Sequence, residues 1–226
     1  MIHVRTGQFA AVVNGKRYEF NPCFAAMAKI GNGRELVECF ATIHGSKYPS
    51  RLPTDPDLRN RIMARCYGEI VQTSMRILKC CSDDETGLLL GECRFTSSGK
   101  LRLKPGIMPV DDVITLAQHC MYHGLIGDGP EENTSEIQEG EYKPTFDVLD
   151  FVYSAVAHLG LSESEAWGMT MTGYRAAVRA KTPPDERNEK GKPNVHINKR
   201  DYDEQMEAAK RVLELMKKRE QEKARN

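Results

Sequence analysis

Apolar residues recur three and four positions apart through most of residues 1–180, and this spacing predicts amphipathic helices. The longest run, from Leu58 to Leu78, forms a broad stripe that we expect to lie at the centre of the core. A helix over 145–159 is predicted to carry a further stripe of Phe146, Leu149, Val152, Tyr153 and Val156. In chain order the predicted helices cover about 22–30, 34–44, 56–81, 110–123, 145–159 and 171–180.

Residues at the predicted helix ends supply the chemistry that a helix terminus needs. Asn21-Pro22 predicts the first N-terminus, because Asn can accept hydrogen bonds from free N–H groups and Pro lacks an N–H that would have no partner there. Further N-termini are predicted at Thr54 or Asp55 before Pro56, at Ser162 with Glu165 in a capping box, and at Thr170 or Thr172. Helix ends are predicted at Gly31, Gly45, Gly124 and Gly160.

Two segments alternate like short strands rather than helices. Phe9–Val13 and Lys16–Phe20 flank Asn14-Gly15, and both turn residues tolerate the positive φ of a tight hairpin turn. A second hairpin is predicted from Leu88–Phe95 and Leu101–Leu103 around Ser97-Ser98-Gly99. The predicted fold class is therefore α+β and predominantly helical, with one or two short β-hairpins.

The composition changes after residue 180. Residues 181–226 contain 13 Lys or Arg and 10 Asp or Glu, with prolines grouped near the start of this segment. We therefore predict a globular domain at 1–180, a flexible linker at 181–200 and a charged helix at 201–226. The acidic stretch 127–143 is predicted to be a flexible loop within the domain.

The overall charge argues against two classes of partner. Lys+Arg and Asp+Glu are both 32, so a strongly basic nucleic-acid module and a polybasic membrane binder are disfavoured. No apolar run reaches the length of a membrane span, and the first residues lack the basic-then-apolar pattern of an export signal. The cysteines are odd in number and are predicted to be reduced core thiols, namely Cys23, Cys39, Cys66, Cys80, Cys81, Cys93 and Cys120.

Candidate chemical sites lack the spacing that their chemistry requires. Ligand types for zinc occur at Cys80, Cys81, Cys93, His119, Cys120 and His123. A structural zinc site uses separated pairs such as two C-x2-C motifs, whereas Cys80 and Cys81 are adjacent and point in different directions. Phosphate-binding glycine loops and nucleophile motifs are missing from the sequence. We expect no metal, no cofactor and no enzymatic activity.

A helix-turn-helix regulator is the alternative from another functional class. This motif can be drawn over Asp111–Gly127 or over Ser162–Ala180. The second segment offers only Arg175, Arg179 and Lys181 to DNA phosphates. Because DNA binding needs several phosphate contacts, this alternative ranks second.

The most unusual local string is Trp167-Gly-Met-Thr-Met-Thr-Gly-Tyr174. Its four large side chains suit adaptable contacts with a partner, and they equally suit the closing of a core. Both interpretations stay open for the candidate partner-binding residues Trp167, Met169, Met171 and Tyr174.

Three segments resemble the tail assembly chaperones of long-tailed bacteriophages, which are encoded beside the tape measure protein. The first comprises 20–31, 34–37 and 43–45, with Cys23 where such proteins are expected to have Ser. The second is 117–127, and the third is 158–172, which is similar to an "L-G-[LM]-S-x-x-E-A-x-x-M-T-M-T" pattern.

This resemblance implies a non-enzymatic role in the cytoplasm of a bacterial host. Such chaperones coat the aggregation-prone tape measure protein and recruit tail tube protein. The implied partners are thus two phage proteins, with no nucleic acid and no membrane. A helical domain can offer an apolar groove to an amphipathic helix, which fits this role physically.

Overall fold

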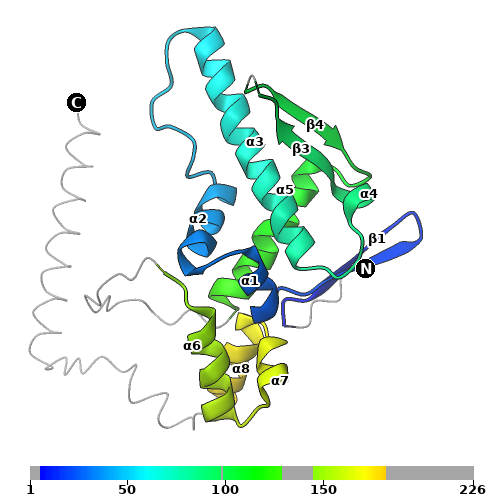
Figure 1. The fold of residues 1–226 in the computed structure, drawn as a ribbon, viewed down its shortest axis with the longest axis vertical. Coiled ribbons are helices and arrows are strands. Elements are labelled where there is room, and N and C mark those ends of the chain that lie inside the picture. The colour runs from blue at the N-terminus through cyan, green and yellow to red at the C-terminus, as the bar shows by residue number, and fades with distance from the viewer. Residues whose placement is uncertain (1–5, 98, 129–144, 182–226) are drawn as a thin grey trace, which may run out of the picture. The chain divides into compact units, whose positions relative to one another are not determined.

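The computed structural model describes residues 6–97, 99–128 and 145–181 and confirms the predicted helix-rich α+β class (Figure 1). No helix in these three ranges is long and apolar enough to cross a membrane. The elements are β1 (Phe9–Val13), β2 (Lys16–Phe20), α1 (Phe24–Ile30), α2 (Gly33–Ile43), α3 (Pro56–Cys80), α4 (Gly87–Leu90), β3 (Gly91–Phe95), β4 (Leu101–Pro105), α5 (Val110–Met121), η1 (Tyr122–Ile126), α6 (Val148–Ser154), η2 (Ala155–Leu159), α7 (Glu163–Trp167) and α8 (Met171–Lys181).

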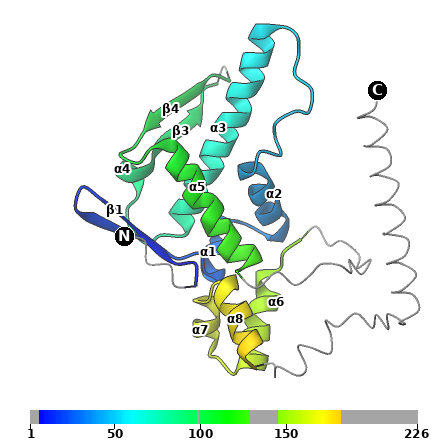
Figure 2. The same cartoon turned by 180° about the vertical axis from the view of Figure 1, so that it is seen from behind.

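Helices α3 and α5 lie side by side in both views and form the centre of the core (Figures 1 and 2). From Cys66 to Leu78, the apolar stripe of α3 is buried as predicted, except that Tyr67 is half-buried. The first turns of α3 differ, because they project past α5 and leave Leu58 and Met63 45% and 39% exposed. The prediction that the whole stripe is core is therefore wrong for this end of the helix.

The first predicted hairpin is confirmed. Strands β1 and β2 pair antiparallel with Phe9 opposite Phe20 and Val13 opposite Lys16. Asn14 and Gly15 have φ values of 50° and 79°, the left-handed conformation that the two central residues of this tight turn need.

The second hairpin is confirmed, but its first strand begins three residues later than predicted. Leu88 belongs to α4, a single helical turn closed by a hydrogen bond from the Leu90 amide to the Thr86 carbonyl. Gly91 follows with a φ of 75°, and the backbone of Lys104 and Gly106 lies where a side chain would project. Only glycine fits this change of direction, so the strand starts there.

The predicted start of the first helix is wrong. Helix α1 begins at Phe24 and not at Pro22, because Asn21 is engaged elsewhere. The Asn21 amide donates to the Cys81 carbonyl at 2.7 Å, and its side-chain oxygen accepts from Gln8. The chain therefore stays extended as far as Cys23, which pairs with Thr170 in an isolated β-bridge.

Gly124 does not end its helix as predicted. Helix α5 continues through the π-helical turn η1, which ends at Ile126 before Gly127. Gly124 instead allows close packing, since an added Cβ would lie 2.6 Å from the Met27 sulfur. Gly160 does end η2, in the left-handed conformation, and the predicted helix before it starts at Val148 after an Asp147 cap.

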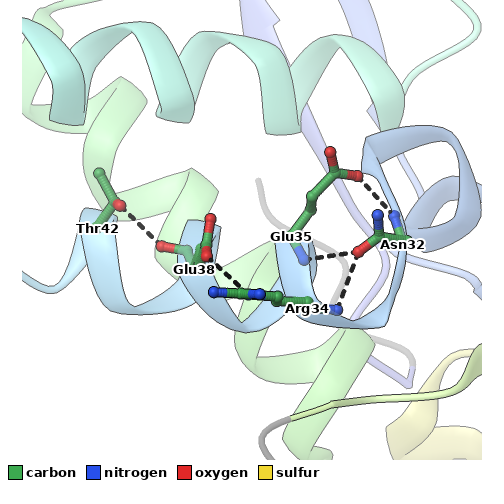
Figure 3. Close-up of polar contacts among 5 residues, drawn as sticks. All are labelled: Asn32, Arg34, Glu35, Glu38 and Thr42. Carbon is green, nitrogen blue, oxygen red and sulfur yellow. Dashed lines mark hydrogen bonds and ion pairs between the residues drawn. The ribbon is translucent and has the colours of Figure 1, made fainter.

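The other capping predictions are largely confirmed. Asp55 caps α3 with Pro56 in its first turn, and Ser162 forms a capping box with Glu165. The Thr170 hydroxyl accepts a hydrogen bond from the Gly173 amide at the start of α8. A second capping box, at Asn32 and Glu35, starts α2 at Gly33, one residue before the predicted start (Figure 3).

Two predicted segments fall almost wholly outside the described residues. These are the acidic loop 127–143, apart from its first two residues, and the linker and charged helix at 181–226, apart from Lys181. Lys181 itself is the last residue of α8. All seven cysteines are free, and four of them are buried, namely Cys39, Cys66, Cys81 and Cys120.

Candidate partner-binding surface

The string from Trp167 to Tyr174 connects α7 to α8 and lies against α1. Its Met169 carbonyl accepts a hydrogen bond from the Phe24 amide at 2.8 Å. The next residue, Thr170, is 2% exposed and donates its hydroxyl to the Thr6 carbonyl. This segment therefore joins the end of the described domain to its beginning.

The four candidate residues lie in one region, and each of them packs on the core. Met171 is 3% exposed and contacts the backbone turn at Gly127. The Tyr174 ring meets Phe151 edge-on at 5.6 Å, and its hydroxyl lies 2.7 Å from the Ser154 hydroxyl.

Trp167 and Met169 are half-buried, and the Trp167 indole N–H donates to the Glu163 carboxylate. Met171, in contrast, is a core residue, because it is almost fully buried. The exposed parts of Trp167 and Met169 are still accessible to a partner.

Helix α6 has one buried and one exposed apolar face. On its inner face, the Phe151 ring stacks on Phe24 at 6.0 Å and on Phe146 at 4.9 Å. Leu149 and Tyr153 are 47% and 55% exposed, so their predicted place in a buried stripe is wrong. They are four residues apart and hence neighbours on the outer face of the helix.

The sequence contained the signal for this exposed face. Buried Val148, Val152 and Ala155 already provide a stripe at i, i+4 and i+7, with Phe151 beside it. Leu149 and Tyr153 lie outside that stripe, and a helix with more apolar residues than one buried face needs presents the rest outward.

A pair of histidines, where α5 passes into η1, lies against the start of α8. His119 and His123 have ring centroids 4.3 Å apart, and Nδ1 of His123 is 2.7 Å from the Thr172 hydroxyl. Burial lowers the pKa of both imidazoles. Nε2 of His119 is buried and has no hydrogen-bond partner among the described residues, which fits a neutral ring. We assign this pair to packing, because the His119 ring meets Phe9 edge-on and the His123 ring meets Tyr122 edge-on.

The cysteines and histidines do not assemble into a metal centre in the parts of the chain that the structure describes, where no group of three candidate ligands occurs. A hydrogen bond with Cys120 and burial raise the pKa of the Cys81 thiol, and burial raises that of Cys80. Metal binding requires thiolates, so these raised pKa values disfavour it.

One of the two helix-turn-helix segments is excluded by the fold. The residues of Asp111–Gly127 up to Ile126 lie in the continuous helix of α5 and η1, without the turn that the motif requires. Helices α7 and α8 do enclose a turn, but the Arg175 guanidinium donates to the carbonyls of Ile126 and Gly127. The Arg175 side chain is therefore already hydrogen-bonded within the protein, which disfavours it as a contact to a DNA phosphate.

The three segments that resemble tail assembly chaperones meet around α1 (Figure 2). Met27 of the first segment packs against Gly124 of the second. Phe24 of the first is hydrogen-bonded to Met169 of the third, and Gly127 of the second contacts Met171 of the third. Residues that are far apart in the sequence thus form a single structural unit.

The family of unknown function DUF6246 matches residues 20–204. The chain belongs to this family. The DUF6246 match includes every helix from α1 to α8 and both strands of the second hairpin, and it begins at the last residue of β2. No curated protein and no solved structure matches the chain.

Proposed function

We propose that this DUF6246 protein is a non-enzymatic tail assembly chaperone of a long-tailed bacteriophage. It binds the tape measure protein and tail tube protein in the cytoplasm of the bacterial host. The resemblance of three segments supports this proposal. Their mutual contact around α1 adds support, because they share one packed unit rather than being scattered over the surface.

The outer face of α6 is the observation that carries the proposal. Stacking of Phe151 on Phe24 and Phe146 fixes the orientation of the helix. Leu149 and Tyr153 then project outward as adjacent, half-exposed apolar side chains. Such a pair fits against the apolar stripe of an amphipathic helix, and long helices of this kind are what a tape measure protein would offer.

Co-expression with the tape measure protein of the same phage tests this function. We expect the wild-type chain to raise the soluble yield of that protein. The double variant Leu149→Gln, Tyr153→Gln should reduce the yield toward that of the tape measure protein alone, because glutamine keeps the helix but removes the apolar contact. Val12→Gln is the matched control, since Val12 is 56% exposed on β1, a different element.

Two results would contradict different parts of the proposal. If the wild-type chain leaves the soluble yield unchanged, the chaperone function is wrong. If the wild-type chain and the double variant raise the yield equally, the function stands but the binding face is not α6. Circular dichroism of the purified variants checks that each has retained its helices.

A further inference from the structure

A second surface feature lies away from α6, in the groove between α3 and the second hairpin. The groove has a volume of about 550 Å³. Its polar wall includes Arg76 and Lys79 from α3 and Glu92 and Arg94 from β3, while Met75 and Cys93 contribute apolar surface. Three cationic side chains and one anionic side chain therefore line this partly apolar groove.

Packing of the hairpin on α3 builds this groove. At Gly68 the absence of a side chain admits Phe95 and Leu101, whose atoms lie 2.6 Å from where a Cβ would be. One turn later, the Gln72 side chain donates to the Cys93 carbonyl at 3.0 Å. Both contacts fix β3 beside the helix, and the groove lies along the following turn of α3.

The hairpin carries an electrostatic conflict on the face that bears Arg94. Strand register places Arg94 directly opposite Arg102, and Glu92 opposite Lys104. Directly opposed side chains of an antiparallel pair have Cβ atoms about 5 Å apart, so two arginines there repel one another. Within the described residues, neither Arg94, Arg102 nor Lys79 forms an ion pair. Among the described residues, no ion pair therefore offsets this repulsion.

From this geometry we infer that the groove between α3 and β3 is a docking site for an acidic polypeptide segment of a partner protein. Carboxylates of the segment would neutralise Lys79 and Arg94, while its apolar side chains would contact Met75 and Cys93. Arg76 donates one hydrogen bond to the Cys39 sulfur at 2.8 Å and would contribute its charge through its remaining N–H groups. A nucleic acid fits less well, because Glu92 would oppose its phosphates and the apolar part of the wall would have no counterpart on its backbone. This inference does not depend on the proposed chaperone function.

Fluorescence anisotropy with the full chain tests this inference. The probe is a labelled peptide rich in Glu with interspersed Leu, and a single-stranded oligonucleotide of equal length is the comparison. We expect salt-sensitive binding of the peptide that is stronger than binding of the oligonucleotide. Arg76→Glu combined with Arg94→Glu should weaken peptide binding at least about tenfold. Arg59→Glu is the control, because Arg59 is exposed on α3 but does not line the groove.

The single variant Arg94→Glu provides a readout that misfolding cannot imitate. Glu at this position faces Arg102 as an opposite charge, so the melting temperature should stay equal or rise while peptide binding falls. Equal losses of binding in the Arg59→Glu and groove variants would overturn the inference, as would stronger binding of the oligonucleotide. Absence of peptide binding to the wild-type chain at low salt would also overturn it.

Discussion

The imidazole rings of His119 and His123 lie 4.3 Å apart, one helical turn from each other where α5 passes into η1. Phe9 meets the His119 ring edge-on at 5.1 Å, and Thr172 is hydrogen-bonded to His123. The hairpin, α5 and α8 therefore all contact one titratable pair. Protonation of either ring would place a charge in a buried site next to another imidazole.

This pair should make the stability of the domain depend on pH. Burial holds the pKa of both folded histidines below the ordinary value of 6.5, with His119 lowering that of His123 further. Below that pH the unfolded chain binds more protons than the folded one, so the free energy of unfolding decreases as the pH falls. Asp128, which raises the pKa of His123, and the hydrogen bond between His119 and the Gly7 backbone oppose the effect only partly.

Melting temperatures measured between about pH 7.5 and pH 5 test this expectation. His119→Gln should flatten the decrease, whatever its effect on stability at neutral pH. His158→Gln is the control, because His158 is exposed on η2. An unchanged slope in the His119 variant would show that other groups cause the pH dependence.

Replacing Gly33 by alanine should destabilise the domain. At the start of a helix this change normally favours folding by up to about 1 kcal/mol. Here, however, an added Cβ would lie 2.9 Å from the backbone carbonyl carbon of Phe146, whose amide donates to the Gly33 carbonyl. We expect a loss of about 1–3 kcal/mol in urea unfolding.

Gly87→Ala is the matched control for this substitution. Gly87 is also the first residue of a helix, and nothing lies within 4 Å of the added Cβ. If both alanine variants change the free energy of unfolding equally, the contact between Gly33 and Phe146 does not limit the packing of α2.

Removal of the Asn32 side chain should destabilise α2 by about 1 kcal/mol. Its oxygen accepts from the amides of Arg34 and Glu35, and the Glu35 carboxylate accepts from the Asn32 amide (Figure 3). Asn32→Ala removes the first two bonds. Glu38→Ala is the control, since it breaks only an exposed ion pair with Arg34 and should cost at most about 0.5 kcal/mol in the same denaturation experiment.

Met171 and Trp167 should respond differently to alanine substitution. Met171→Ala removes a fully packed side chain and should cost about 2–5 kcal/mol of folding free energy. Trp167→Ala should lower the melting temperature less, and it should weaken binding of the proposed partner, the tape measure protein, more than it lowers stability. If Trp167→Ala destabilises the domain as much as Met171→Ala, Trp167 is a core residue like Met171.

Local chemistry in the sequence was sufficient for the elements that depend on it. Asn14-Gly15 predicts its turn because the required φ values depend on these two residues alone. Asp55-Pro56 predicts the start of α3 for a similar reason, since both the cap and the missing N–H are properties of adjacent residues. Helix-rich content follows from periodicity, which is likewise visible in one dimension.

Errors arose where a distant residue decides the local structure. Asn21 does not cap α1, because its side-chain oxygen accepts from Gln8 and its backbone amide is held by Cys81, sixty positions away in the sequence. Gly124 continues a helix and packs closely on Met27, a residue almost a hundred positions earlier in the sequence.

The candidate surfaces were predictable to different degrees. Unusual composition singled out the string from Trp167 to Tyr174, although it could not separate Met171 in the core from Trp167 at the edge. The basic groove was beyond prediction, because it requires Arg76 and Arg94 to lie on two elements that only the fold brings together.

The hydrogen bond between Phe24 and Met169 also constrains how the protein is made. Phe24 is completely enclosed in the finished fold, yet part of its enclosure is synthesised almost last among the described residues. During translation, the apolar face of α1 therefore stays exposed until residues 169–174 have been synthesised. Folding of the domain should therefore be completed late and cooperatively, and the growing chain is a natural substrate for molecular chaperones that bind nascent polypeptides.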